Sequence, residues 1–176
     1  DGEDRRIRMT QGPVKLEPPL PGPAVQRIRE ALGVAMEDLD ASLPVQVAST
    51  GHSKVMIPLR SRRSLAALAP DLPALAALSG ELGCNGYFAF TFDSPDPGAL
   101  TQARMFAPAI GIPEDPVTGN GNGPLGAYLV HHGRAAHDEC TFAFRGAQGD
   151  RTGRSGFVDV EVAREQGAPV RVSITG

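Results

Sequence analysis

The stretch EDPVTGNGNGPLGAYLV, residues 114–130, decides the fold that we predict for this chain. Its second part, residues 124–130, carries apolar or small residues at nearly every position. A helix without a polar face is a buried helix, so strands have to surround it. Pro124 suits the first position of such a helix, where its missing N–H costs nothing. We therefore expect a central apolar helix near residues 124–130.

Short apolar runs separated by glycine and proline predict the strands around this helix. These runs span residues 45–50, 54–59, 87–93, 100–107, 141–144, 157–163 and 170–174. Shorter helices are expected at about residues 24–32, 64–69 and 72–78. The sequence thus predicts an α+β fold in which a mostly antiparallel sheet curls round the central helix.

The composition excludes several classes of protein. The chain has 176 residues, of which 41% are hydrophobic and 21% charged, as in a globular domain. Its net charge of −3 argues against a nucleic-acid partner, and no apolar stretch approaches the ~20 residues of a membrane helix. Cys84 and Cys140 are far apart, which argues against a disulfide scaffold and a metal site. We expect a cytoplasmic protein.

Residues 114–124 carry the strongest functional signal. The glycine and asparagine run at residues 119–122 permits positive φ angles and a close approach of the backbone to a ligand. At the start of a helix, free backbone N–H groups bind anions. The spacing is neither that of a Walker loop nor that of a dinucleotide-binding fingerprint. A small carboxylate substrate is therefore expected, held by the amides of Gly119, Asn120 and Gly121.

An acidic pair lies just before this run. Pro116 fixes the chain after Glu114 and Asp115, so that one carboxylate can be aimed at the bound anion. A carboxylate beside a substrate carboxylate indicates proton transfer at a nearby carbon, with Asp115 as the acid or base. The alternative is a structural glycine turn at the end of a core helix, with Asp115 in solvent.

Residues 103–133, ARMFAPAIGIPEDPVTGNGNGPLGAYLVHHG, resemble the signature block of the PhzF-like family of phenazine biosynthesis. The segments STGHSKVMIPL (49–59) and QGDRTGRSGFVDVEV (148–162) also resemble this family. The resemblance implies the diaminopimelate epimerase fold, with two lobes that each curl a sheet round a helix and a site in the cleft between them. It also implies an enzyme without cofactors, usually a homodimer, that moves a proton within its substrate. The best-known members isomerise trans-2,3-dihydro-3-hydroxyanthranilate.

The resemblance assigns roles to individual residues. The family's aspartate falls on Asp115, and its Thr-Gly-Ser segment falls on Thr118 and Gly119, with Asn120 where serine is common. Asn120 can still donate and accept hydrogen bonds, so ligand binding survives the change while the substrate stays open. The turn that carries His52 is placed near the cleft, so His52 is a candidate ligand contact; a solvated turn histidine is the alternative.

The resemblance also predicts the organisation of the chain. Residues 1–12 are expected to be the last strand of an otherwise absent first lobe, which in the family carries the glutamate that shuttles the proton. Residues 13–23 form a proline-rich connector, and residues 24–176 the second lobe. A strand at residues 7–10 then lacks a partner. The chain alone is expected to be inactive unless another chain supplies the first lobe. The alternatives are a non-catalytic carboxylate-binding module and a structural half that dimerises through sheet edges.

Overall fold

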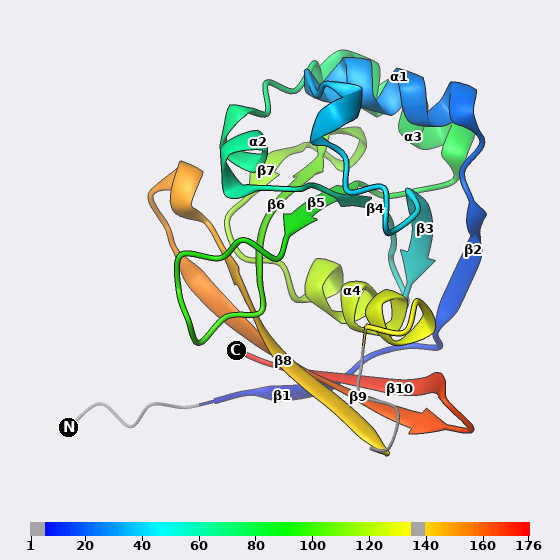
Figure 1. The fold of residues 1–176 in the computed structure, drawn as a ribbon, viewed down its shortest axis with the longest axis vertical. Coiled ribbons are helices and arrows are strands. Elements are labelled where there is room, and N and C mark those ends of the chain that lie inside the picture. The colour runs from blue at the N-terminus through cyan, green and yellow to red at the C-terminus, as the bar shows by residue number, and fades with distance from the viewer. Residues whose placement is uncertain (1–5, 135–139) are drawn as a thin grey trace.

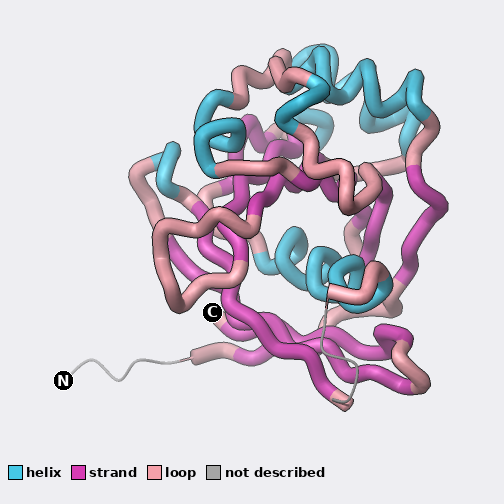
Figure 2. Tube along the Cα trace, in the orientation of Figure 1, coloured by secondary structure: helices cyan, strands magenta, loops and turns pink. Residues whose placement is uncertain are grey.

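A single curved sheet organises the molecule. The computed structural model describes residues 6–134 and 140–176. Its ten strands follow the order β1-β10-β9-β8-β6-β5-β4-β3-β2, with β7 paired to β6. The sheet bends round helix α4, and three further helices cover the outer face of one half of it (Figures 1 and 2). The α+β class and the sheet curled round a central helix are confirmed. The sheet is mixed, because β4–β5 and β6–β8 pair in parallel.

Most of the elements agree with those expected from the sequence, whereas the strands at Lys15–Pro19 and Ile112–Asp115 were not predicted. The helices are α1 (Gly22–Leu32), α2 (Arg62–Ala67), α3 (Leu72–Leu82) and α4 (Gly119–His131), with 3-10 turns η1 (Met36–Asp38), η2 (Pro108–Ile110) and η3 (Asp150–Thr152). The strands are β1 (Arg8–Thr10), β2 (Lys15–Pro19), β3 (Gln46–Ser49), β4 (Ser53–Pro58), β5 (Tyr87–Thr91), β6 (Thr101–Ala107), β7 (Ile112–Asp115), β8 (Thr141–Gln148), β9 (Gly156–Glu165) and β10 (Ala168–Thr175).

Alternation along β4, β5 and β6 divides the apolar core into two clusters. Successive side chains of a strand point to opposite faces. Met56, Phe88 and Met105 stand opposite one another in register and pack in the cluster that surrounds α4. The neighbouring residues Val55 and Tyr87 pack in the cluster beneath α1, α2 and α3. The central strands are therefore buried on both faces, which explains their continuous apolar sequences.

Helix α4 begins five residues earlier than predicted, so the expectation of a positive-φ glycine loop is wrong. None of its glycines has a positive φ. They are required because neighbouring side chains lie so close to the helix that a Cβ atom at these positions would clash with them. A Cβ atom on Gly121 would lie 2.4 Å from the ring of Phe88, and one on Gly126 would lie 2.8 Å from Val160 and Val162. The glycines do allow a close approach, but to protein atoms.

Two expectations about the start of the chain also need correction. The strand predicted at residues 7–10 has a partner, because β1 pairs antiparallel with β10. The proline-rich connector contains the edge strand β2, which pairs with β3. Proline is tolerated at a sheet edge, where its missing N–H breaks no ladder. The division at residues 12 and 23 remains a prediction, and residues 1–5 lie outside the described part of the chain.

Within residues 6–134 and 140–176, no helix is long and apolar enough to cross a membrane.

Candidate functional site

Asp115 lies at the end of β7, opposite Met105 of β6, and is partly buried. It therefore continues the row of side chains that packs against α4. Its Oδ2 accepts a hydrogen bond of 2.8 Å from the hydroxyl of Thr118, the residue immediately before α4. Its Oδ1 accepts no hydrogen bond from the residues that the structure describes. One oxygen is thus fixed and the other is available to a ligand.

Gln148, at the end of β8, holds this turn against the helix. Its buried Oε1 accepts hydrogen bonds from the backbone N–H of Thr118 at 3.1 Å and from Nδ2 of Asn122 at 2.9 Å. Its Nε2 donates to the carbonyl of Asp115 at 3.2 Å. Because the side-chain amide of Gln148 bonds to both Asp115 and Thr118, strand β8 helps to fix the positions of these two residues. In the sequence, Gln148 is distinguished only as the first residue of the segment 148–162 that resembles the family.

The first turn of α4 leaves two backbone amides unused. The N–H of Gly121 donates to the carbonyl of Thr118 at 3.1 Å, so this amide is not free to bind a ligand as proposed. The N–H groups of Gly119 and Asn120 have no acceptor among the described residues. They lie at the positive end of the helix dipole. A hollow of about 420 Å³ borders Val117, Gly119 and Asn120. Two of the three expected amide donors are therefore unpaired among the described residues, and both belong to residues that border this hollow.

Gln11 and Thr50 extend the polar cluster outward. The Thr50 hydroxyl donates to Oε1 of Gln11 at 2.5 Å, and Nε2 of Gln11 donates to Oδ1 of Asn120 at 3.1 Å. His52 is exposed, and its Nδ1 lies 3.5 Å from Nδ2 of Asn85. No hydrogen bond joins His52 to Asp115 or to the start of α4 in the described structure. The fold therefore brings Asp115, Thr118, Gly119 and Asn120 together, and a ligand contact by His52 stays a prediction.

Lys54 is a buried cation that the sequence analysis missed. It lies two residues before Met56 on β4 and is only 2% exposed. Its Nζ donates a long hydrogen bond of 3.4 Å to the carbonyl of the preceding Ser53. Burial lowers the pKa of the Lys54 ammonium, while the charges of Cys84 and Asp115 act in the opposite direction. A buried positive charge thus lies within electrostatic range of Asp115. Its signal in the sequence was a lysine in a strand of otherwise apolar residues.

Taken together, the cluster can hold an anion and move a proton. Two amides and a buried ammonium supply positive potential, and a fixed carboxylate supplies a proton acceptor. In the described residues, no group of three or more His, Cys, Asp and Glu side chains is placed to share a metal ion.

Comparisons with known proteins place the chain among relatives of one family. The family model of phenazine biosynthesis-like proteins, PhzC-PhzF, matches residues 2–176. The uncharacterized isomerase YddE of Escherichia coli K12 is 49% identical over 175 residues, which are 99% of this chain and 58% of that protein. The trans-2,3-dihydro-3-hydroxyanthranilate isomerase of Pseudomonas chlororaphis is 32% identical over 105 residues, 60% of this chain and 34% of that protein.

The fold is also found in a solved structure. The PhzF-family protein of Bacillus anthracis matches with a TM-score of 0.84 at 23% identity, over 97% of this chain and 57% of that chain. The chain therefore spans a little under three fifths of the length of these two longer proteins from Escherichia coli and Bacillus anthracis.

Proposed function

Because this chain belongs to the PhzC-PhzF family of phenazine biosynthesis-like proteins, we propose that it forms one wall of the active site of a cofactor-independent isomerase. The substrate is a small carboxylate, and the reaction moves a proton from one carbon of the substrate to another. The remaining part of the site comes from a first lobe, either in the same protein or in another chain. The complete enzyme is proposed to be a homodimer.

The contacts of Asp115 carry this proposal. The substrate carboxylate binds at the N–H groups of Gly119 and Asn120, near the positive end of α4. Oδ1 of Asp115 then accepts a proton from a substrate carbon, while the Thr118 hydroxyl stabilises Oδ2. Returning the proton to a different carbon completes the isomerisation, with no net gain or loss of atoms. A second acid or base from the first lobe shares the transfer, and Lys54 stabilises the negative charge that develops.

The decisive experiment measures proton exchange. The full-length protein, with both lobes, is incubated in deuterated water with trans-2,3-dihydro-3-hydroxyanthranilate, and deuterium in the product is followed by NMR. Asp115→Asn is expected to lower the rate more than tenfold, because general acid–base catalysis contributes ~10²–10⁴ in rate. The control Glu165→Gln changes an exposed carboxylate on β9 and should leave the rate unchanged.

The Thr118 hydroxyl is tested in the same assay. Thr118→Ser keeps the hydrogen bond to Asp115 and should retain most of the activity, whereas Thr118→Val should lose it. An unchanged rate in Asp115→Asn would remove Asp115 from the mechanism. If this substrate is not turned over, the same assay with other small cyclic carboxylates separates a wrong substrate from a wrong site.

A carboxylate-binding module without catalysis is the second candidate. It is favoured by the hydrogen bond that Nε2 of Gln11 donates to Oδ1 of Asn120. Because this oxygen is occupied, Asn120 can offer a ligand only the hydrogen-bond donors of its Nδ2. Calorimetry distinguishes the two functions. Binding of carboxylates without deuterium exchange, even with the first lobe present, would support the module.

A further inference from the structure

A second pocket lies on the opposite face of β6 from α4. It has a volume of about 290 Å³ and is bordered by residues of α2, of the start of β6 and of η3 in the β8–β9 connection. Along β6, Ala103 and Met105 pack in the cluster around α4, whereas the guanidinium of Arg104 donates to backbone carbonyls of Leu65 and Leu68 in and just after α2. The sheet therefore separates this pocket from the site at Asp115.

The pocket is rich in arginine, although the chain has a net charge of −3, and one of these arginines, Arg62, lies 4.0 Å from the carboxylate of Asp93. Four arginines line it against a single carboxylate: Arg62, Arg63, Arg104 and Arg151, with Asp150. The charge of Arg104 is already paired, because its guanidinium donates two hydrogen bonds of 2.8 Å to the carboxylate of Glu114. Arg63 and Arg151 form no ion pair or hydrogen bond with any residue that the structure describes. Two guanidinium groups at the rim are thus available to a ligand.

A buried amide inside the pocket gives an independent indication of a ligand. Gln102 lines the pocket and is only 5% exposed. Its side chain makes no hydrogen bond within residues 6–134 and 140–176. An amide that borders a pocket and has no partner in the described protein can both donate a hydrogen bond to a bound molecule and accept one from it. A polar group of a ligand would satisfy it.

We propose that this pocket binds a compact organic anion with an apolar body about the size of one ring. The apolar body packs on Leu65, Ala66 and Pro95, which lie in the non-polar part of the lining. Arg63 and Arg151 bind its carboxylate or phosphate, since planar guanidinium groups match both oxyanions. The amide of Gln102 binds a second polar substituent. The volume is near the lower limit of small-molecule sites, so only a small ligand fits.

Calorimetry on the full chain with phenyl phosphate, benzoate and inorganic phosphate tests the proposal. We expect at least one of the two aromatic anions to bind with one-to-one stoichiometry, and inorganic phosphate to bind at least tenfold more weakly because it lacks the apolar body. Combined replacement Arg63→Ala and Arg151→Ala should weaken binding at least tenfold, and Gln102→Leu should also weaken it. Ala66→Phe should abolish binding by filling the pocket.

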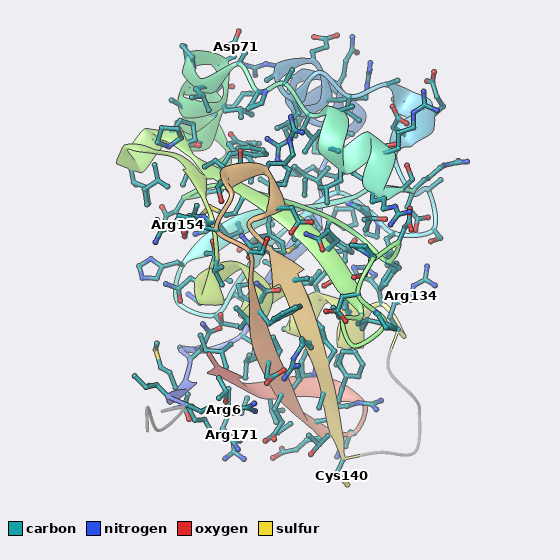
Figure 3. All side chains as sticks on the ribbon, turned by 90° about the vertical axis from the view of Figure 1, so that its left-hand side faces the viewer. Arg6, Asp71, Arg134, Cys140, Arg154 and Arg171 are labelled. Carbon is teal, nitrogen blue, oxygen red and sulfur yellow. The ribbon has the colours of Figure 1, made fainter. Side chains whose placement is uncertain are left out.

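Control variants locate the bound anion. Arg171→Ala removes an exposed arginine on β10, at the opposite end of the molecule from α2, and should change nothing (Figure 3). Asp115→Asn alters the other site and should also leave binding unchanged. Binding that survives Ala66→Phe but responds to Asp115→Asn would place the anion at the helix start and refute the proposal. Absence of saturable binding to a folded chain would refute it as well, without bearing on the isomerase function.

Discussion

Replacing Gly126 with alanine tests whether the glycines of α4 are there for packing. A Cβ at this position would lie 2.8 Å from Cγ atoms of Val160 and Val162 and 3.3 Å from the ring of Phe144. Gly80 in α3 is the matched control, because a Cβ there has no neighbour within 4 Å. Both glycines lie within helices and neither has a positive φ. The two substitutions therefore add the same methyl group to similar backbone in different surroundings.

The magnitude follows from these distances. Carbon atoms pack best at about 3.5–4.0 Å, so each valine has to withdraw by about 0.7 Å or more. Val160 and Val162 are buried in β9 and have little room to move. Inserting a methyl group into a packed core costs about 1–3 kcal/mol, whereas Gly→Ala within a helix gains up to about 1 kcal/mol. Because the helix gain is common to both variants, Gly126→Ala should be less stable than Gly80→Ala by about 1–3 kcal/mol.

Urea denaturation followed by circular dichroism measures this difference in the free energy of unfolding, and thermal denaturation provides a second measurement. For a chain of this size, the melting temperatures of the two variants should differ by about 2–12 °C. Gly80→Ala is expected to equal or exceed the parent chain in its free energy of unfolding. If Gly126→Ala proves as stable as Gly80→Ala, the packing explanation for the glycine run is refuted.

Three further predictions concern charged groups. Glu114→Gln should lower the free energy of unfolding by about 3 kcal/mol, because it leaves the largely buried Arg104 without its partner, and thermal denaturation measures this loss. Lys54→Met should leave stability unchanged or raise it by about 1 kcal/mol while lowering the isomerase rate of the full-length protein tenfold or more; equal losses of stability and rate would contradict a role beside Asp115. Burial, followed by the charges of neighbouring residues, lowers the pKa of His132 below its usual 6.5, so the unfolded chain binds a proton that the folded chain does not. Stability should therefore fall as pH decreases below about 6.5, and a urea series at several pH values should show a smaller fall in His132→Gln.

The sequence was sufficient for the strands that form apolar runs, and the reason is local, whereas the proline-rich β2 and the short β7 were not predicted. Apolar runs in β4, β5 and β6 are continuous because both faces of these strands are buried, and each run ends at a glycine, proline or polar turn. The end of α1 was also predictable, since Gly33 has a φ of 68°, the left-handed geometry that follows many helices. The start of α4 was not predictable from propensity, because glycine disfavours helix unless the tertiary structure demands close packing.

The residues around Asp115 illustrate a second limit. Lys54 and Gln148 lie 61 and 33 residues away from it along the chain, and only the pairing of strands brings them near. The register that aligns Met56, Phe88, Met105 and Asp115 in one row is a property of four strands together. The glycines of α4 then have a second consequence. Because they let the helix lie close against this row, Thr118 at the start of the helix is placed to donate its hydrogen bond to Asp115. Packing and chemistry are therefore coupled: a methyl group added at Gly121 should shift the helix start and lower the isomerase rate even where the fold survives.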